Sequence, residues 1–381
     1  MIRDESTLNV IVGTVAQFVK ERLIPIEMEV SENNHIPAEI IAEIGDLGLF
    51  GLTIPEEYGG LDLTIEEETR VYMELCYTSP VFRSLISSNV GPGAKVIVND
   101  GTSSQKERYL PLIASGEKIL AYALNEHGIG SNPGNMMTNA CRVGDNYVIN
   151  GTKSFVTNAP NAGLVMVFAR TDAEACGTSG ISAFLIETGT PGMNIGKPEK
   201  KMGNWGSHVS DVIFTDCRVS ASALIGGLEG VGFETAMACR NRSSIIIAAA
   251  AVAASNRIID DTVRYSLERK QFGQAIAEFQ MIQSLLAYSK TESYAAKCMT
   301  LDAANKFDDG NDTNMVAASC KYFATEMVGT VVDRAVQIFG GYGYIRESSV
   351  ERFYRDVRLL RLCDGTSQTQ KQLVVQSIFA A

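Results

Sequence analysis

The chain has 381 residues, of which 45% are hydrophobic and 20% charged, the composition of an ordinary globular protein. Its net charge of -11 and its pI near 5.0 argue against a surface that binds nucleic acid or an anionic membrane. The longest strictly apolar run, residues 245–254, is much shorter than the roughly 20 residues that cross a bilayer, and no secretory signal is visible. We expect a soluble, cytoplasmic protein without a membrane span.

The hydrophobic pattern changes twice along the chain. In residues 1–118 apolar residues recur at helical spacing, as in AEIIAEIGDLGLFGL. In residues 119–225 short β-branched and aromatic segments such as GLVMVFART lie between Gly, Asn and Asp, which is typical of strands. The segments Gly144-Asp145-Asn146 and Asn150-Gly151 are predicted hairpin turns, because their residues tolerate positive φ.

Helical spacing returns after residue 226. Residues 231–268, 274–308 and 312–340 are predicted to form long helices whose many small residues favour close packing in a bundle. An all-α region, a β region and a second all-α region in this order predict an α+β protein and exclude a doubly wound sheet. We expect three domains, at residues 1–118, 119–225 and 226–381.

Several common kinds of site are absent from the sequence. The eight cysteines form no CxxC pair, and no Cys/His spacing indicates a metal, so we expect reduced thiols and no metal site. No GxSxG nucleophile elbow is present. The segment GIGSNPG at 128–134 has the wrong spacing for a dinucleotide-binding fingerprint and lies between predicted strands. A redox cofactor would therefore be held in another way.

Specific segments then follow one another in order along almost the whole chain. They are PEEYGGLDL (55–63), GTSSQKERYLPLIASGEK (101–118), YALNEHGIGS (122–131), NGTKSFVTNA (150–159), ERKQFGQAIAEFQ (268–280), QIFGGYGY (337–344) and ERFYRDVRLLRLCDGTSQTQK (351–371). Together they resemble the acyl-CoA dehydrogenase family, and their order agrees with the α–β–α pattern.

This resemblance implies a fold and a reaction. The family has an N-terminal all-α domain, a central β-barrel or sandwich domain and a C-terminal four-helix bundle, which together enclose FAD and an acyl-CoA. A base removes the α-proton of the thioester while hydride passes from the β-carbon to flavin N5, giving the 2,3-enoyl-CoA. The electrons then pass to an electron-transfer flavoprotein, and the usual assembly is a homotetramer, a dimer of dimers.

Asp364 stands where the family places its glutamate base. A thioester α-C–H is a weak acid, so its removal needs a positioned base, and a carboxylate enclosed by flavin and substrate is a stronger base than one in water. The resemblance implies that the backbone N–H of Asp364 and a flavin hydroxyl hold the enolate oxygen. Aspartate is one methylene shorter than glutamate, so the substrate sits differently, or the reaction is slower, or it is a different reaction. Without the resemblance, Asp364-Gly365 would be read as a solvated turn.

Further residues match positions that the family uses to contact FAD. Thr157 corresponds to a threonine near flavin N5, and Phe155 replaces the usual tryptophan beside the ring. An arginine suits the pyrophosphate because its planar fork donates two parallel hydrogen bonds. Expected in the same subunit are Tyr122, Asn125, Ser131, Phe155, Thr157, Thr366 and Gln368, and expected from the neighbouring subunit are Arg269, Phe272, Gln280, Gln337, Gly340 and Gly341.

The substrate side is less specific. Arg242 matches an arginine that contacts the acyl-CoA, and Asn241 lies where some members carry their base instead. Cys363 replaces a tyrosine that often lines the pocket. Arg83 lies where glutaryl-CoA dehydrogenases bind a distal carboxylate, and it pairs either with such a substrate or with a protein carboxylate. The expected substrate residues are Ser131, Asn241, Arg242, Cys363, Gly365 and Arg83.

Two alternatives remain open at this point. The departures at positions 125, 127, 155, 205, 363 and 364 are compatible with other flavin chemistry on the same fold, namely that of a monooxygenase, a desulfinase, an enoyl reductase or an acyl-carrier-protein dehydrogenase. The substrate is then an acyl-CoA or an acyl-carrier-protein thioester. The second alternative is a non-catalytic protein that retains FAD structurally.

Overall fold

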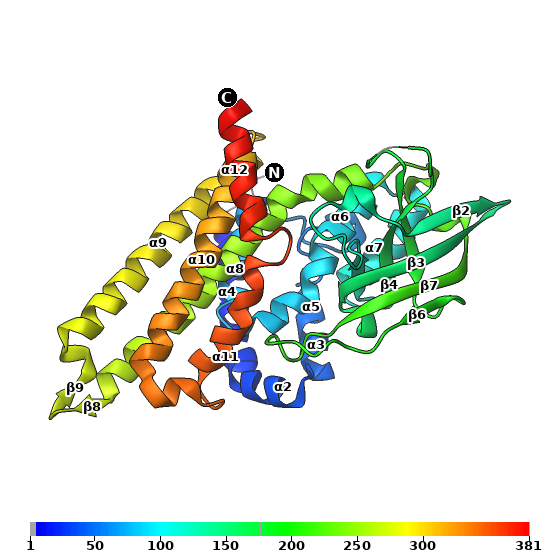
Figure 1. Cartoon of the computed structure of the whole chain (residues 1–381). Helices are drawn as coiled ribbons and strands as arrows, with labels where there is room; N and C mark the ends of the chain where they lie inside the picture. The colour runs from blue at the N-terminus through cyan, green and yellow to red at the C-terminus, as the bar shows by residue number, and fades with distance from the viewer. Residues whose placement is uncertain (1–4, 176, 381) are drawn as a thin grey trace.

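A computed structural model describes residues 5–175 and 177–380 of the chain. Its N-terminal part is helical, and the helices stand beside the bundle formed by the C-terminal part (Figure 1). Two of these helices begin with reciprocal caps, in which Thr64 pairs with Glu67 and Thr102 with Gln105. The helices are α1 (Glu5–Phe18), α2 (Glu27–Asn33), α3 (Ala38–Asp46), α4 (Ile65–Leu75), α5 (Pro80–Val90), α6 (Pro92–Asp100) and α7 (Ser103–Ala114).

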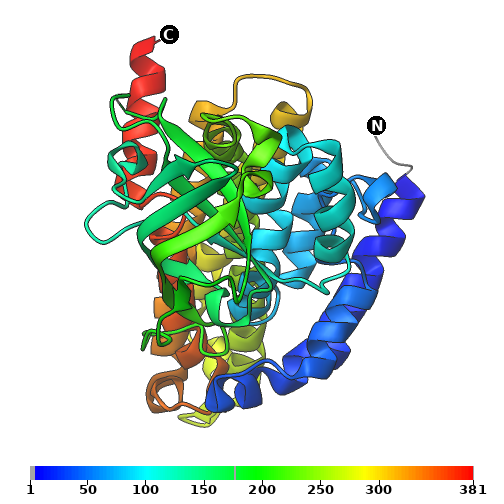
Figure 2. The same ribbon diagram turned by 90° about the vertical axis from the view of Figure 1, so that its right-hand side faces the viewer.

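The middle of the chain forms one sheet of seven strands, which lies in front of the C-terminal helices in Figure 2. The path runs β1-β4-β2-β3-β7-β6, and β5 pairs with β4. Alternating burial along β3 and β7 places one face of each strand in the core. The strands are β1 (Leu120–Ala123), β2 (Asn139–Val143), β3 (Asn146–Thr157), β4 (Leu164–Arg170), β5 (Ile181–Glu187), β6 (Met193–Ile195) and β7 (Val209–Ser220).

Of the two predicted hairpin turns, one is confirmed and one is wrong. Gly144 and Asp145 connect β2 to β3. Asn150 and Gly151 lie inside β3, where the register against β7 shifts. Gly151 has φ 144°, and a Cβ there would lie 2.5 Å from Thr138 Oγ1. The Asn-Gly pair therefore makes a bulge that lets a neighbouring backbone approach, and not a turn.

The C-terminal part is a bundle built around α8. Helix α8 buries small residues toward α10 on one side and toward the N-terminal helices on the other, which explains why it is apolar over much of its circumference. By length and composition α8 could cross a membrane, but 83% of its most apolar window is buried, as in the core helix of a bundle. The elements are α8 (Phe233–Glu268), β8 (Lys270–Gln271), β9 (Gln274–Ala275), α9 (Gln280–Asp308), α10 (Asn314–Phe339), α11 (Ser349–Asp356) and α12 (Ser367–Ala380).

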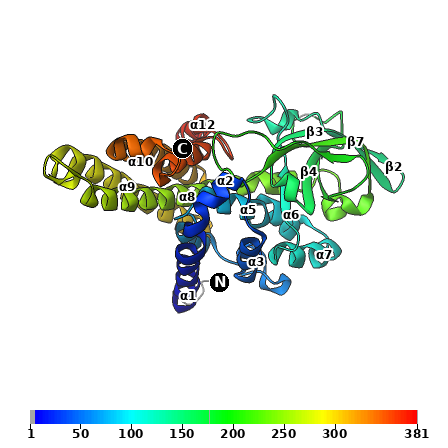
Figure 3. The same ribbon diagram turned by 90° about the horizontal axis from the view of Figure 1, so that it is seen from below.

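The predicted start of the second long helix is wrong. Residues 274–279 do not extend α9, because the chain first makes the β8–β9 hairpin and a short 3-10 turn. Phe272 and Gly273, both with positive φ, form the tip of this hairpin. The hairpin projects from the end of the bundle opposite the sheet (Figure 3).

A buried carboxylate joins the N-terminal helices to the bundle. Glu27 on α2 accepts hydrogen bonds from Arg257 on α8 at 3.1 Å and from Arg352 on α11 at 2.6 Å. It also accepts from the Thr78 hydroxyl at 2.6 Å and from the Ser79 N–H at 3.0 Å. Four segments distant in sequence are thus fixed around one charge.

Candidate active site

Asp364 lies on a short loop that precedes α12. Asp364 has φ 48° and Gly365 has φ 93°, so two consecutive residues adopt left-handed conformations. Beneath the loop, the Lys321 ammonium of α10 donates to the carbonyl oxygens of Cys363 at 2.5 Å, Asp364 at 2.9 Å and Gly365 at 2.7 Å. Lys321 is only 1% exposed, and burial lowers its pKa.

Residues from all three parts of the chain lie within electrostatic reach of Asp364. Its charge acts on the pKa of Arg83 from α5, of Tyr122 from β1 and of Lys321 from α10. Burial, assisted by Asp364 and Cys239, raises the pKa of Tyr122 well above its usual value. Asp364 itself is exposed. An exposed carboxylate can exchange a proton with a molecule that binds beside it.

Arg83 has no carboxylate partner in the part of the chain that the structure describes. Among the described residues no hydrogen bond or ion pair to its side chain is found, and its Nε is buried without a partner. Burial lowers the pKa of Arg83, but the facing Cys363, Tyr72, Cys76 and Asp364 outweigh burial and raise it. Of the two alternatives for Arg83, pairing with a protein carboxylate is therefore not observed.

Two expected substrate residues have protein partners. The guanidinium of Arg242 forms a buried ion pair with Glu68 of α4, although its Nε has no partner. Burial raises the pKa of Glu68, against the effect of Arg242. The Asn241 amide donates to Thr313 Oγ1 at 3.3 Å and to Asn314 Oδ1 at 3.0 Å, so it fixes the start of α10.

The residues expected beside the flavin ring lie near the C-terminal ends of strands β1 and β3. Phe155 is 63% exposed and has φ 55°, an uncommon conformation for a bulky residue, which turns its ring out of the strand. The Ser154 N–H donates to the carbonyl of Asn125 at 2.8 Å, which joins β3 to the loop that follows β1. That loop carries the exposed Ser131, and Thr157 ends β3.

A buried ion pair that the sequence did not predict shapes the same loop. Lys153, fully buried on β3, donates to Glu126 at 2.8 Å and to the Leu124 carbonyl at 3.1 Å. Glu126 in turn accepts from the N–H groups of Met137 and Thr138 at 2.8 and 3.0 Å. The sequence did contain a signal for this ion pair, because Lys153 occupies an inward position in a strand of alternating residues.

The residues expected to serve a neighbouring subunit gather elsewhere, in a group that we call the bundle tip. It comprises the C-terminal ends of α8 and α10, the β8–β9 hairpin and the start of α9, far from the sheet in Figure 1. Tyr265 stacks on Phe339 with ring centroids 4.1 Å apart, which fixes α8 against α10 there. All the expected residues of the tip are exposed: Arg269, Phe272, Gln280, Gln337, Gly340 and Gly341. The single chain does not bring them to Asp364.

Thr366 and Gln368 flank the start of α12. The Thr366 hydroxyl accepts from the Thr369 N–H at 3.3 Å, as in a helix cap, and Gln368 is exposed. Trp205, at one of the positions that depart from the family pattern, lies between the guanidinium groups of Arg346 and Arg355, at 5.1 and 4.2 Å from its ring centroid.

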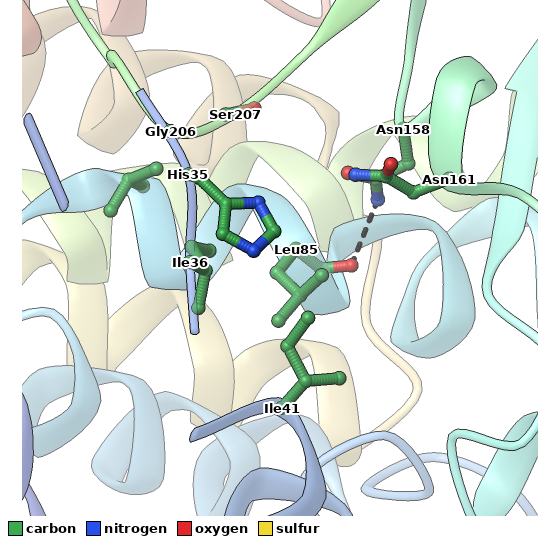
Figure 4. Close-up of a pocket in the computed structure, with 9 residues that line it drawn as sticks. His35, Ile36, Ile41, Leu85, Asn158, Asn161, Gly206 and Ser207 are labelled. Atoms are coloured by element: carbon green, nitrogen blue, oxygen red, sulfur yellow. Dashed lines mark hydrogen bonds between the residues drawn. The ribbon is translucent and has the colours of Figure 1, made fainter. Parts of the chain in front are cut away.

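A small pocket lies beside this region without belonging to it. Figure 4 shows His35 directed into a space bounded by Ile41, Leu85 and Asn158, with the Asn158 amide donating to the Leu85 carbonyl at 2.8 Å. None of the expected site residues lines the pocket. Its nearest lining residue in sequence is Asn158, which directly follows Thr157.

Comparison with known proteins decides the family. The chain matches the N-terminal, middle and C-terminal domains of acyl-CoA dehydrogenase over residues 6–117, 121–217 and 230–379. It belongs to the acyl-CoA dehydrogenase family. Members of this family are FAD-dependent oxidoreductases, which confirms the fold, the enzyme class and the cofactor expected from the sequence.

Individual relatives in this acyl-CoA dehydrogenase family are named for both directions of the reaction. The 3-(aryl)acrylate reductase of Clostridium sporogenes is 38% identical, with 95% of both chains covered. Subunit CarC of the caffeyl-CoA reductase-Etf complex of Acetobacterium woodii is 36% identical, with 93% of both covered. The structure of butyryl-CoA dehydrogenase from Megasphaera elsdenii superimposes with a TM-score of 0.93 at 32% identity, covering 100% of both chains.

The residues present fit FAD. At the bundle tip a Cβ added to Gly340 or Gly341 would meet nothing within 4 Å, so a nucleotide has room to approach the backbone there. The exposed Arg269 side chain lies beside them, over the Tyr342 ring at 5.6 Å. On strand β3 of the sheet, the outward ring of Phe155 offers an apolar surface to a flat ring system.

Among the described cysteines, at positions 76, 141, 217, 239, 298, 320 and 363, all are free thiols. Cys176 lies outside the described residues.

Proposed function

We propose that this enzyme interconverts a saturated acyl thioester and its 2,3-enoyl thioester, with Asp364 as the group that moves the α-proton. The supporting observation is the convergence of Asp364, Arg83 and Tyr122 from three parts of the chain. Oxidation, in which Asp364 removes the proton from an acyl-CoA, is the leading direction.

The chain's own residues bind and orient the reactants. Tyr122, Asn125, Ser131, Phe155 and Thr157 would hold the flavin ring, together with Thr366 and Gln368 of the same subunit. When bound, FAD accepts or supplies the hydride at the β-carbon. The Asp364 N–H would hold the thioester oxygen, on which negative charge develops as the α-proton leaves. Ser131, Cys363 and Gly365 would line the path of the thioester.

Arg83 supports a polar or anionic acyl chain. A guanidinium with a buried unpartnered Nε is costly to leave unsatisfied, and a carboxylate on the substrate would offset that cost. A dicarboxylic acyl-CoA is the simplest substrate of this kind. Arg242, already paired with Glu68, would line the pocket without binding the distal carboxylate.

The direct test is anaerobic loss of flavin colour in FAD-loaded enzyme mixed with a panel of acyl-CoAs. The panel contains glutaryl-CoA, a longer diacid and the monoacids of matched length. We expect bleaching, strongest with a diacid, and a rise in KM for the diacid of about 10- to 100-fold in Arg83→Met. Bleaching by monoacids alone, with Arg83→Met unaffected, would contradict the role of Arg83. A protein that binds no added FAD would contradict the whole proposal.

A second candidate is the reductive direction, favoured by the likeness to 3-(aryl)acrylate reductase. Here Asp364 would deliver a proton to the α-carbon of an enoyl thioester. The experiment is to reduce the flavin chemically and to add enoyl-CoAs, including aryl ones, without oxygen. If the enoyl-CoA reoxidises the reduced flavin faster than the matching acyl-CoA bleaches the oxidised flavin, the result would support the reductive direction. Rapid oxygen uptake with ligand bound would instead indicate monooxygenase chemistry.

Assembly and electron transfer are part of the proposal. The exposed bundle tip, including Phe272 at 94% exposure, would cover a neighbouring subunit's flavin in a homotetramer built from two dimers. An electron-transfer flavoprotein would be the redox partner, as the complex of the related CarC subunit suggests. An acyl-carrier-protein thioester would reach the same loop if the carrier replaces CoA.

A further inference from the structure

The loop that carries Asp364 is held by a cation that the proposed reaction does not use. Lys321 directs its ammonium at the carbonyl oxygens of Cys363, Asp364 and Gly365, at 2.5, 2.9 and 2.7 Å. An ammonium has three N–H donors, so its hydrogen-bonding capacity is satisfied by this one loop. Among the described residues no carboxylate forms an ion pair with it.

The direction of three carbonyls fixes the direction of three amides. In a trans peptide the N–H points opposite to the C=O of the same peptide group. The carbonyls of residues 363, 364 and 365 converge on Lys321, so the N–H groups of Asp364, Gly365 and Thr366 point away from it. None of these amides donates a hydrogen bond to another described residue. They are available to a bound oxygen.

A neutral donor also contacts this loop. Gln370, also buried, already reaches the carbonyls of Asp364 and Gly365, at 3.5 and 3.4 Å. Burying a charged lysine without a carboxylate is costly, so its charge calls for a reason. A cation on the carbonyl side polarises each peptide group and strengthens the N–H on the far side as a donor.

We propose that Lys321 is a positioning residue, which aligns and polarises the amides of residues 364–366 so that they stabilise the negative charge developing on the thioester oxygen. Lys321 does not touch the substrate and transfers no proton. The proposal rests on the proposed function, because it concerns the same loop and the same thioester.

The test compares Lys321→Met and Lys321→Gln with Lys201→Met. Lys201 is a matched control, because its ammonium also donates to consecutive loop carbonyls, those of Gly203 and Asn204 at 3.2 and 2.6 Å, in another part of the molecule. Each variant is loaded with FAD, and kcat and KM are measured separately. We expect kcat to fall about 100-fold in Lys321→Met with KM changed only a few-fold, as for loss of an oxyanion donor. Lys201→Met should change thermal stability alone.

A second readout does not depend on turnover. The carbonyl stretching frequency of an enoyl-CoA bound to the oxidised enzyme reports polarisation of the thioester oxygen. We expect the downshift from free ligand to shrink in Lys321→Met and in Lys321→Gln. An unchanged downshift, or a loss of kcat that matches the control, overturns the proposal. Lys321→Gln keeps two donors for the loop, so it provides the same test should Lys321→Met fold poorly.

The two levels of inference fail in different ways. Wild-type enzyme that shows neither bleaching nor a carbonyl downshift with any thioester overturns the proposed function, and the role of Lys321 with it. Wild-type enzyme that shows both effects, with both retained in Lys321→Met, overturns the role of Lys321 alone.

Discussion

The two ends of the molecule are built in opposite ways. Around Asp364, the ion pairs and hydrogen bonds form within one chain, as Lys321 under the loop and the Arg242–Glu68 pair show, while the Nε atoms of Arg83 and Arg242 stay unpartnered among the described residues. At the bundle tip the expected flavin residues are exposed, and Phe272 is 94% exposed in a left-handed conformation. The Asp364 region thus makes its contacts within one chain, whereas the bundle tip presents its side chains to solvent. The contrast supports an active centre shared between copies.

The largest effect is expected at Asp364. Asp364→Asn keeps the size of the side chain and removes its basicity, so kcat should fall about 10²- to 10⁴-fold, the usual contribution of a general base. FAD content should stay the same, because the carboxylate is not needed to hold the ring. Stopped-flow bleaching measures the rate. A variant with more than a tenth of wild-type kcat would contradict the role of Asp364.

Glu27→Gln tests whether a buried charge holds the N-terminal helices to the bundle. Removing this charge leaves Arg352 without its ion-pair partner and Arg257 with Asp261 alone, and the free energy of unfolding should fall by about 3–5 kcal/mol. Denaturant titration followed by circular dichroism measures the loss. The matched control is Glu43→Gln, which breaks the solvent-exposed pair with Arg22 and should change stability little. Equal losses in the two variants would remove the distinction.

Asp356, a second buried carboxyl group, gives a pH test of stability. Burial raises the pKa of Asp356 from its usual 3.8 to about 6, against the Asn204 N–H and two arginines. The folded chain therefore binds this proton more tightly than the unfolded chain, and the resulting stability is present below pH 3.8 and lost as the pH rises through about 6. The expected loss is about 3 kcal/mol, relative to Asp356→Asn. Thermal midpoints of the two proteins between pH 4 and 7 measure it, and a constant difference would contradict the buried-acid assignment.

The bundle tip yields the smallest expected change and the sharpest test of sharing. Arg269→Glu should lose FAD, and Asp364→Asn should lack its base, so each homo-oligomer is inactive. In a mixed dimer, one active centre combines the intact Asp364 of the Arg269→Glu chain with the intact Arg269 of the Asp364→Asn chain. The second active centre of that dimer carries both substitutions and is inactive. A random equal mixture should regain about a quarter of wild-type activity. Co-expressed, doubly tagged chains measure it, and no regain over the separate variants would place both residues in one chain's site.

Much of this architecture was readable in the sequence. The long helices predicted at 231–268 and 312–340 lie at Phe233–Glu268 and Asn314–Phe339, because small apolar residues recur there at helical spacing. The turn at Gly144-Asp145 was also predicted. Asn150-Gly151 misled because the same residue pair that favours a turn also permits a bulge, and only the close approach of Thr138 distinguishes them.

Other features depend on tertiary contacts that no local pattern contains. The β8–β9 hairpin was missed because Phe272 adopts a left-handed conformation that its residue type disfavours. Lys321 was missed although a signal existed, because it lies on the buried stripe of α10 with Ala317 and Ala324. The sequence marks such a lysine as unusual, but only the fold shows which loop it faces. The assignments of Asp364 and of the flavin contacts remain predictions.

Helix α8 has a consequence for how the enzyme is loaded. It carries Arg242, beside the proposed thioester pocket, and its last residue, Glu268, is followed directly by Arg269 on the bundle tip, roughly 40 Å away along one uninterrupted axis. In the proposed assembly, one rigid rod thus connects two different catalytic centres. Dissociation would strip prosthetic group from both partners at once, so holoenzyme content should depend on protein concentration when no excess dinucleotide is present.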